Sequence, residues 1–320
     1  MKLSERAIIE RLRHIFQSPP PPEGMGDDAA FVRGRDGLLL STDMMFQSTH
    51  FPRYYNSWQS GYMAAAANIS DIAAMGGTPS ALLVSLGVPP RMRIEELTEF
   101  ARGVMKCSRK YGAKIIGGDT KAAKEFTVCM TAVGLRGKRI LTRAGAKKGH
   151  LLAVTGKLGA AAADELAYLS GEVKRPFLPE PRVSEGRMLA ERLSASSAID
   201  ITDGLAVSAH YLAEQSVVRM EIDFSAVPIA HRLRRYANDR GLREAVLYWG
   251  GDYQLLFTLP ANKSGELKRV IPEASIIGKV CEGSGVYITY GERRERARST
   301  GYDAFGARKN ADILSAWRAN

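Results

Sequence analysis

Aspartates that end apolar segments beside Gly, Ser or Thr are the residues of this chain most suited to chemistry. Burying a carboxylate without a partner is costly, and no regular Lys or Arg accompanies these acids along the sequence. Bound divalent cations would supply the missing charge, and oxygen-only ligands favour magnesium or calcium over zinc. Carboxylates that hold magnesium at strand ends indicate phosphate chemistry. The segments are Gly26-Asp27-Asp28-Ala29, Ser41-Thr42-Asp43, Ser70-Asp71, Gly117-Gly118-Asp119-Thr120, Asp200-Ile201-Thr202-Asp203-Gly204 and Gly251-Asp252.

Two of these segments have structural alternatives. Asn68 and Asp71 are three residues apart and share a helix face, which could be an exposed polar stripe. Because the surrounding residues are Ala, Ile and Met, that helix looks buried nearly all round, and we favour a ligand role for Asp71. Asp200, Thr202 and Asp203 lie at a strand-to-helix junction, where capping would explain one of them but not all three.

The paired Gly117 and Gly118 follow the apolar Ile115-Ile116, and we expect a loop there. Glycines let backbone N–H groups approach a phosphate closely, although a plain tight turn is the simpler interpretation of this pair alone. His50 follows the Asp43 strand and could contact a ligand, whereas the other four histidines are interpreted as structural or exposed.

The elements that position these residues alternate between helix and strand. Hydrophobic periodicity and turn residues predict helices at 3–16, 57–75, 94–111, 159–169, 183–193, 205–215 and 232–240. Strands are expected at 29–32, 38–46, 81–88, 114–117, 126–134, 151–155, 198–201, 220–224 and 253–259, with two more within 275–290. The order predicts an α/β fold with mixed sheets and two domains, 1–142 and 143–320.

Composition describes an ordinary globular chain of 320 residues with 45% hydrophobic residues. The start of the chain lacks the apolar core of a signal peptide, and the three cysteines form no CxxC pair, so we expect a cytoplasmic protein with no membrane association. The net charge of +11 could attract nucleotides or nucleic acid. The clearest basic cluster, Arg293 to Arg298, is interrupted by Glu295 and lacks interleaved aromatics, so a nucleic-acid partner is not expected.

Common catalytic motifs are missing from the sequence, including the Walker A loop, the protein-kinase signature set, the GxSxG elbow and the HExxH pair. A serine hydrolase or zinc protease is therefore disfavoured. Phosphoryl transfer needs positioning and neutralisation of phosphate charge, which a set of aspartates with magnesium can supply without a P-loop.

In their order along the chain, the motifs resemble those of the thiamine-monophosphate kinases. That family belongs to a superfamily with aminoimidazole ribonucleotide synthetase, selenophosphate synthetase and a hydrogenase maturation factor. Gly26-Asp27-Asp28-Ala29 is similar to the family GDD motif, and Ser41-Thr42-Asp43 with His50-Phe51 to its STD…HF segment. Residues 68–76 resemble its N-x-SD-x-AAMG helix. The other matches are Gly117-Gly118-Asp119-Thr120, Asp200-Ile201-Thr202-Asp203-Gly204-Leu205 and Gly251-Asp252-Tyr253-Gln254-Leu255-Leu256-Phe257.

The resemblance implies ATP-dependent phosphorylation of thiamine monophosphate to thiamine diphosphate with several magnesium ions. It also implies a two-domain aminoimidazole ribonucleotide synthetase-like fold, a cleft for the nucleotide and a homodimer formed through the N-terminal sheets. The implied metal ligands are Asp28, Ser41, Thr42, Asp43, Asp71, Asp119, Asp200 and Asp203, of which Asp43, Asp71, Asp119 and Asp203 would be catalytic. The implied ATP contacts are Tyr111, Gly117, Gly118, Arg143 and Thr202, and the implied substrate positions are His50, Gly251 and Tyr302.

Two positions depart from the family pattern. Gly251 stands where the bacterial motif commonly has a Glu, and Tyr302 stands where the family has a Trp that stacks on the substrate. A Tyr can still stack on an aromatic ring, but the missing carboxylate bears on recognition of the cationic thiamine moiety. Two alternatives therefore stay open: a sister enzyme with another small-molecule substrate, and a non-enzymatic protein that binds nucleotides or nucleic acid.

Overall fold

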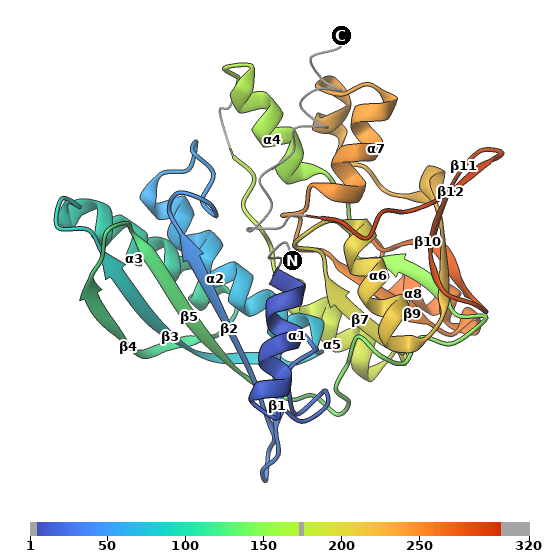
Figure 1. Ribbon diagram of the computed structural model, residues 1–320, viewed down its shortest axis with the longest axis horizontal. Helices are drawn as coiled ribbons and strands as arrows, with labels where there is room; N and C mark the ends of the chain where they lie inside the picture. The colour runs from blue at the N-terminus through green and yellow to red at the C-terminus, as the bar shows by residue number, and fades with distance from the viewer. Residues whose placement is uncertain (1–4, 173–175, 302–320) are drawn as a thin grey trace.

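The computed structural model describes residues 5–172 and 176–301, and it builds two sheets side by side (Figure 1). The N-terminal sheet has the spatial order β1 (Ala30–Val32), β2 (Leu38–Phe46), β5 (Thr127–Leu135), β3 (Thr78–Val88) and β4 (Lys114–Ala122). Neighbouring strands are antiparallel except β3 and β4, which are parallel.

Helices α2 (Ser57–Ala74) and α3 (Ile94–Lys110) cover one face of this sheet (Figure 1). A capping box starts α2, in which Asn56 and Gln59 each donate a backbone N–H to the side chain of the other, both at 2.9 Å. Four consecutive alanines from Ala64 are buried, and their small side chains let α2 pack against α3, α5 and β7 as well as the sheet. This burial on all sides is what the sequence predicted.

The C-terminal sheet contains seven strands in the order β12, β11, β8, β10, β6, β9 and β7. Only β8 and β11 are parallel neighbours. The strand bounds are β6 (Leu151–Val154), β7 (Ser197–Asp200), β8 (Arg219–Asp223), β9 (Leu255–Leu259), β10 (Ser275–Cys281), β11 (Gly285–Tyr290) and β12 (Arg293–Arg296).

Helices cover both faces of the C-terminal sheet. One hydrophobic core joins the sheet to α4 (Ala160–Leu169), α6 (Leu205–Ser216) and α7 (Asp239–Tyr248). A second core joins it to α5 (Val183–Glu191) and α8 (Ser264–Val270). The remaining helices are α1 (Glu5–Ile15) and the short 3-10 turns η1 (Phe224–Ala226), η2 (His231–Arg235) and η3 (Ala261–Lys263).

The predicted α/β class with mixed sheets is confirmed. Ala74 and Leu141, from the N-terminal half, belong to the core that includes α5 and α8. Because that core crosses the proposed division, the boundary between residues 142 and 143 stays a prediction. None of the helices in the described part of the chain is long and apolar enough to cross a membrane.

Two local predictions are wrong, and the basic cluster, for which no element was predicted, forms the strand β12. The loop expected at Gly117 to Thr120 is part of β4, because these residues continue the parallel pairing with β3. A Cβ on Gly118 would lie 1.8 Å from the Val84 carbonyl oxygen, so the close approach of two strands explains this glycine. The helix expected at 232–240 is the 3-10 turn η2, and the true helix, α7, begins later because Asn238 caps it.

Candidate active site

A cavity of about 680 Å³ lies between the two halves of the chain and receives residues from both. From the N-terminal half, Asp43 on β2 and Asp71 on α2 line it. From the C-terminal half come Asp200 at the end of β7 and Asp203 just beyond it. The tertiary fold therefore brings together aspartates far apart in sequence, such as Asp28 and Asp203, whose numbers differ by 175.

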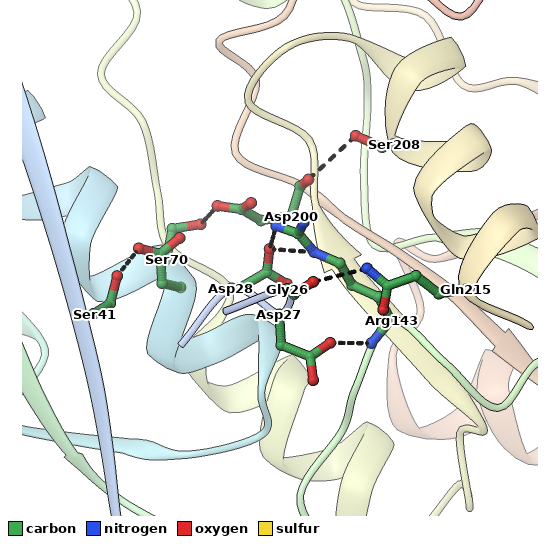
Figure 2. Close-up of polar contacts among 10 residues, drawn as sticks. Gly26, Asp27, Asp28, Ser41, Ser70, Arg143, Asp200, Ser208 and Gln215 are labelled. Atoms are coloured by element: carbon green, nitrogen blue, oxygen red, sulfur yellow. Dashed lines mark hydrogen bonds and ion pairs between the residues drawn. The ribbon is translucent and has the colours of Figure 1, made fainter. Parts of the chain in front are cut away.

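Asp28, Asp71 and Asp200 form the acidic cluster of this cavity. Each offers a carboxylate oxygen, and the three oxygens lie within 4.8 Å of one another. The residues come from three separate elements: the loop before β1, the C-terminal part of α2 and the end of β7. Side chains of Asp28 and Asp200 point toward the same space in Figure 2, with Ser70 of α2 beside them.

Burial and mutual repulsion disfavour the charged form of these carboxyls. Burial raises the pKa of Asp71 well above its ordinary value, and the carboxylates of Asp43, Asp200 and Asp28 add to the effect. Burial, followed by the Asp28 carboxylate, likewise raises the pKa of Asp200. The pKa of Asp43 rises to about 6, with burial as the largest cause. A bound cation would remove this penalty.

Neighbouring hydroxyl and amide groups fix the orientation of the cluster. The Ser70 hydroxyl donates to Asp200 Oδ2 at 2.5 Å, and the Ser41 hydroxyl donates to Asp71 (Figure 2). The backbone N–H of Asp43 donates to the buried Asn68 side chain at 3.3 Å. Asn68 thus ties β2 to α2, which explains its position three residues before Asp71.

Arg143 supplies the positive charge nearest to the acidic cluster. Its Nε donates to Asp28 Oδ1 at 3.1 Å and Nη2 pairs with the same oxygen, while its backbone N–H donates to Asp27 at 2.7 Å (Figure 2). The guanidinium also lies over the Tyr211 ring, 5.0 Å from its centroid. Burial alone would lower the pKa of Arg143, but the Asp28 carboxylate raises it above the ordinary value.

The Arg143 guanidinium does not satisfy every carboxylate oxygen around it. Among the residues that the structure describes, the buried Oδ2 atoms of Asp27 and Asp28 have no hydrogen-bond partner. A buried carboxylate oxygen without a hydrogen-bond partner, beside two further carboxylates, suits coordination of a magnesium ion. The acidic cluster therefore fits a hard divalent cation. Because all its donor atoms are oxygens, it suits magnesium or calcium better than zinc.

The cavity brings together most of the residues that the sequence singled out. Its lining includes Asp28, Ser41, Thr42, Asp43, His50, Asp71, Arg143, Asp200, Thr202, Asp203 and Gly251. Nδ1 of His50 accepts the backbone N–H of Phe46 at 3.2 Å, which holds the ring at the end of β2. The N-cap of α6 is Gly204, so capping of that helix does not explain Thr202 or Asp203.

Four predicted residues lie away from this cavity in the single chain. Tyr111 follows α3, and Gly117, Gly118 and Asp119 lie on the exposed strand β4. The Asp119 carboxylate accepts from the Thr120 backbone N–H at 2.8 Å and pairs with Lys121 at 3.1 Å. These contacts lower the pKa of Asp119, with Lys121 as the first cause. Tyr302 lies outside the described residues.

Asp252 shares the aspartate pattern but has a structural role. Its carboxylate accepts the backbone N–H groups of Gly159 at 2.6 Å, Ala160 at 2.8 Å and Ala161 at 3.3 Å. These are orphan donors at the start of α4, which a side chain from a neighbouring element satisfies here. Sequence reasoning could not separate this aspartate from the others, because the capped helix begins more than ninety residues earlier.

Several cavity residues were missed by the sequence analysis. Tyr253 is buried, and its backbone has a φ of 52°, a left-handed conformation that is uncommon for a tyrosine. Burial raises the pKa of Tyr253 well above its ordinary value, and the carboxylates of Asp43 and Asp200 contribute. Tyr54 and Glu165 also line the cavity. In the sequence, Tyr253 stands in the quoted motif at 251–257, and the aromatic pair Tyr54-Tyr55 follows closely after His50.

Known proteins resemble this chain over most of its length. Residues 26–136 match the AIR synthase related protein, N-terminal domain, and residues 147–291 match the C-terminal domain of the same family. The thiamine-monophosphate kinase of Pyrococcus horikoshii is 37% identical over 309 residues, which are 94% of this chain and 96% of that protein. The chain belongs to the thiamine-monophosphate kinase family. The Aquifex aeolicus enzyme of the same name is 31% identical, covering 90% of this chain and 94% of its own.

Solved structures of this family have the same fold. The structure of AaThiL complexed with AMPPCP and TMP superposes with a TM-score of 0.83 at 29% identity, covering 95% of this chain and 99% of that one. A HypE–HypF complex superposes with a TM-score of 0.78 at 18% identity, covering 91% of this chain and 98% of the other, and it shares the fold alone. The fold that the sequence motifs predicted is therefore confirmed.

Proposed function

We propose that this protein transfers the terminal phosphoryl group of ATP to the phosphate of thiamine monophosphate, giving thiamine diphosphate and ADP. The observation that carries the proposal is the acidic cluster, which lies in a cavity shared by both halves of a thiamine-monophosphate kinase chain. The complex of a related structure with AMPPCP and TMP supports the pairing of the two substrates.

In this reaction a phosphate oxygen of thiamine monophosphate attacks the terminal phosphorus of ATP. The new phosphorus–oxygen bond forms as the bond to the bridging oxygen breaks, and ADP leaves with that electron pair. The attacking oxygen is already ionised at neutral pH, so no general base is required. Consistent with this, the three carboxylates of the acidic cluster lie close enough together to share a cation.

The acidic cluster together with Asp43 and Asp203 would hold magnesium. Bound magnesium neutralises phosphate charge and aligns the two reacting phosphates. Ser41 and Ser70 orient Asp71 and Asp200 for this task. Arg143 is held between Asp28 and the Tyr211 ring. If a magnesium ion bound Asp28 in its place, the Arg143 guanidinium would be able to turn toward the phosphate oxygens.

A homodimer would explain why Asp119 lies apart from the cavity of its own chain. The outer face of the N-terminal sheet exposes apolar side chains, including Met44 at 53%, Leu83 at 37% and Ile116 at 60%. A second copy placed against this face, as the family resemblance implies, would cover them and carry Tyr111, Gly118 and Asp119 toward the partner's cavity. Free cysteines and the need for ATP fit a cytoplasmic location.

The direct test incubates the purified protein with ATP, magnesium chloride and thiamine monophosphate and separates the products. We expect equal amounts of thiamine diphosphate and ADP, and no product when EDTA replaces magnesium. ADP release with another phosphorylated acceptor, but not with thiamine monophosphate, would favour the sister-enzyme alternative. Binding of nucleotide with no acceptor turnover at all would contradict the proposal.

A further inference from the structure

The cavity has a second region whose chemistry differs from that of the acidic cluster. We call it the aromatic end, and it is lined by Tyr54, Tyr55, Glu165, Phe177 and Trp249. The Tyr54 and Tyr55 rings meet edge to face with centroids 5.4 Å apart, and the Tyr55 hydroxyl donates to the Phe177 carbonyl oxygen. The rings are therefore held in place before any ligand binds.

Different charges surround the two regions. Burial raises the pKa of Tyr54, and the charged groups that contribute most are Glu165 and Asp164, which raise it further, and Arg232, which lowers it. The charged groups that contribute most to the raised pKa of Asp71 are instead Asp43, Asp200 and Asp28. Tyr253 lines the same cavity, and burial raises its pKa, to which both Asp43 and Tyr55 contribute. The cavity thus offers a cation-binding, phosphate-compatible region and a region with an aromatic wall and its own carboxylates.

Of the two acids at the aromatic end, Asp164 is committed to the protein wall. It is buried, it pairs with Arg232 at 2.6 Å and it accepts the Phe177 backbone N–H. Glu165 is half-buried on the next position of α4 and lines the cavity itself. A ligand entering the aromatic end meets the Glu165 carboxylate.

Position 251 is a glycine, and the absence of a side chain there leaves room beside Glu165. Ala161 and Glu165 are four residues apart on α4, so they share one helix face, and both line the cavity with Gly251. A Cβ built on Gly251, which has a φ of +81°, would lie 3.0 Å from the Ala161 Cβ. A longer side chain at position 251 would extend into the space in front of this face.

We propose that Glu165 is the counter-charge for the cationic thiazolium ring of the acceptor, with the Tyr54 and Tyr55 rings packing against the planar heterocycles. The assignment rests on the proposed function and names the residue that selects its acceptor. A carboxylate and aromatic rings around a concave, partly desolvated site form a binding site for a planar cation. Gly251 has no side chain beyond its Cα and leaves the loop side of this space open.

The test compares the wild type with Glu165→Gln, which has nearly the same shape and keeps the helix propensity of α4. Steady-state rates are measured with thiamine monophosphate and ATP varied in turn. We expect the KM for thiamine monophosphate to rise about tenfold, while kcat and the KM for ATP stay within about twofold, because a uniform binding contact is lost.

A second ligand separates charge from shape. The phosphate ester of the matching neutral thiazole alcohol is used as a competitive inhibitor of each variant. Glu165→Gln should weaken binding of thiamine monophosphate but leave that of the neutral ester unchanged. Ala161→Met, on the same helix face, narrows the space without changing the charge and should weaken both ligands alike. Glu172→Gln, a carboxylate beyond the end of α4 and outside this cavity, is the matched control.

The outcomes distinguish the inference from the proposed function. A wild type without thiamine-monophosphate kinase activity overturns the proposed function before any variant is compared. An active wild type whose KM and inhibition constants do not change in Glu165→Gln overturns the role of Glu165 and leaves the function standing. Thermal unfolding would reveal a Glu165→Gln protein that does not fold. In that case Glu165→Asp, which keeps the charge but has a shorter side chain, replaces it. We expect an intermediate rise in the KM for thiamine monophosphate in Glu165→Asp.

Discussion

Two regions of the molecule bury aspartates of the same sequence pattern, and their surroundings are opposite. In the acidic cluster, Asp28, Asp71 and Asp200 face one another across less than 4.8 Å. At the start of α4, Asp252 is buried as well, but three backbone N–H groups donate to it. A carboxylate surrounded by backbone N–H donors stabilises the fold, whereas carboxylates that lie next to one another require a cation. Burial and motif alone therefore do not identify a metal ligand; the partners of each oxygen do.

Asp71→Asn should produce the largest effect, because it removes a cation ligand and leaves the fold intact. We expect kcat to fall by at least about a hundredfold. Without magnesium the variant should be more stable than the wild type, because one buried repulsive charge is gone. Activity assays and thermal unfolding with and without magnesium measure both effects. Wild-type activity in this variant would remove Asp71 from the proposed magnesium site.

Asp119 tests whether the acidic cluster is complete within one chain. Asp119→Asn should also lower activity, by about tenfold or more, while changing the free energy of unfolding by less than about 0.5 kcal/mol, because the residue is exposed. If the partner subunit supplies this residue, co-expressing Asp119→Asn with Asp71→Asn should restore about a quarter of wild-type activity. Half of the dimers are then hybrids, and one of the two sites in each hybrid is intact. Failure of the mixture to recover activity would place Asp119 in the site of its own chain.

Asp252→Ala should separate the second region from the first. Three backbone donors lose their acceptor, and we expect a destabilisation of about 2 kcal/mol whether or not magnesium is present. Urea unfolding measured in EDTA and in magnesium gives the two values. Asp252→Asn, which keeps one acceptor oxygen, is the matched control and should lose less. A stability loss that appears only with magnesium would assign Asp252 to the metal site instead.

The smallest predicted effect is a pH dependence of stability in EDTA. The pKa of Asp43 is about 6 in the folded protein against an ordinary 3.8, so the folded state binds the proton more tightly. Stability should therefore fall as the pH rises from 3.8 to about 6, and magnesium should restore it above that range. Thermal unfolding across this range, with Asp43→Asn as the comparison, measures the slope. An equal slope in both proteins would exclude Asp43 as its source.

The sequence by itself predicted the α/β class, most of the helices and strands and the phosphate chemistry. Local signals were sufficient there: the Ala-rich run from Ala64 and the apolar strand before Asp43 act over a few residues. Ordered motifs also identified the family, because each one specifies a residue type at a fixed place along the chain.

Only the tertiary structure decided which aspartates act together. Asp28 and Asp200 lie together because the loop before β1 and the end of β7 converge on α2. Asp252 is not part of this cluster, because its carboxylate accepts backbone N–H groups at the start of α4. The interpretation of Gly118 changed for the same reason, since its closest neighbour is Val84 on the adjacent strand. A carboxylate's role depends on what surrounds its oxygens, and those neighbours come from parts of the chain that no local pattern connects.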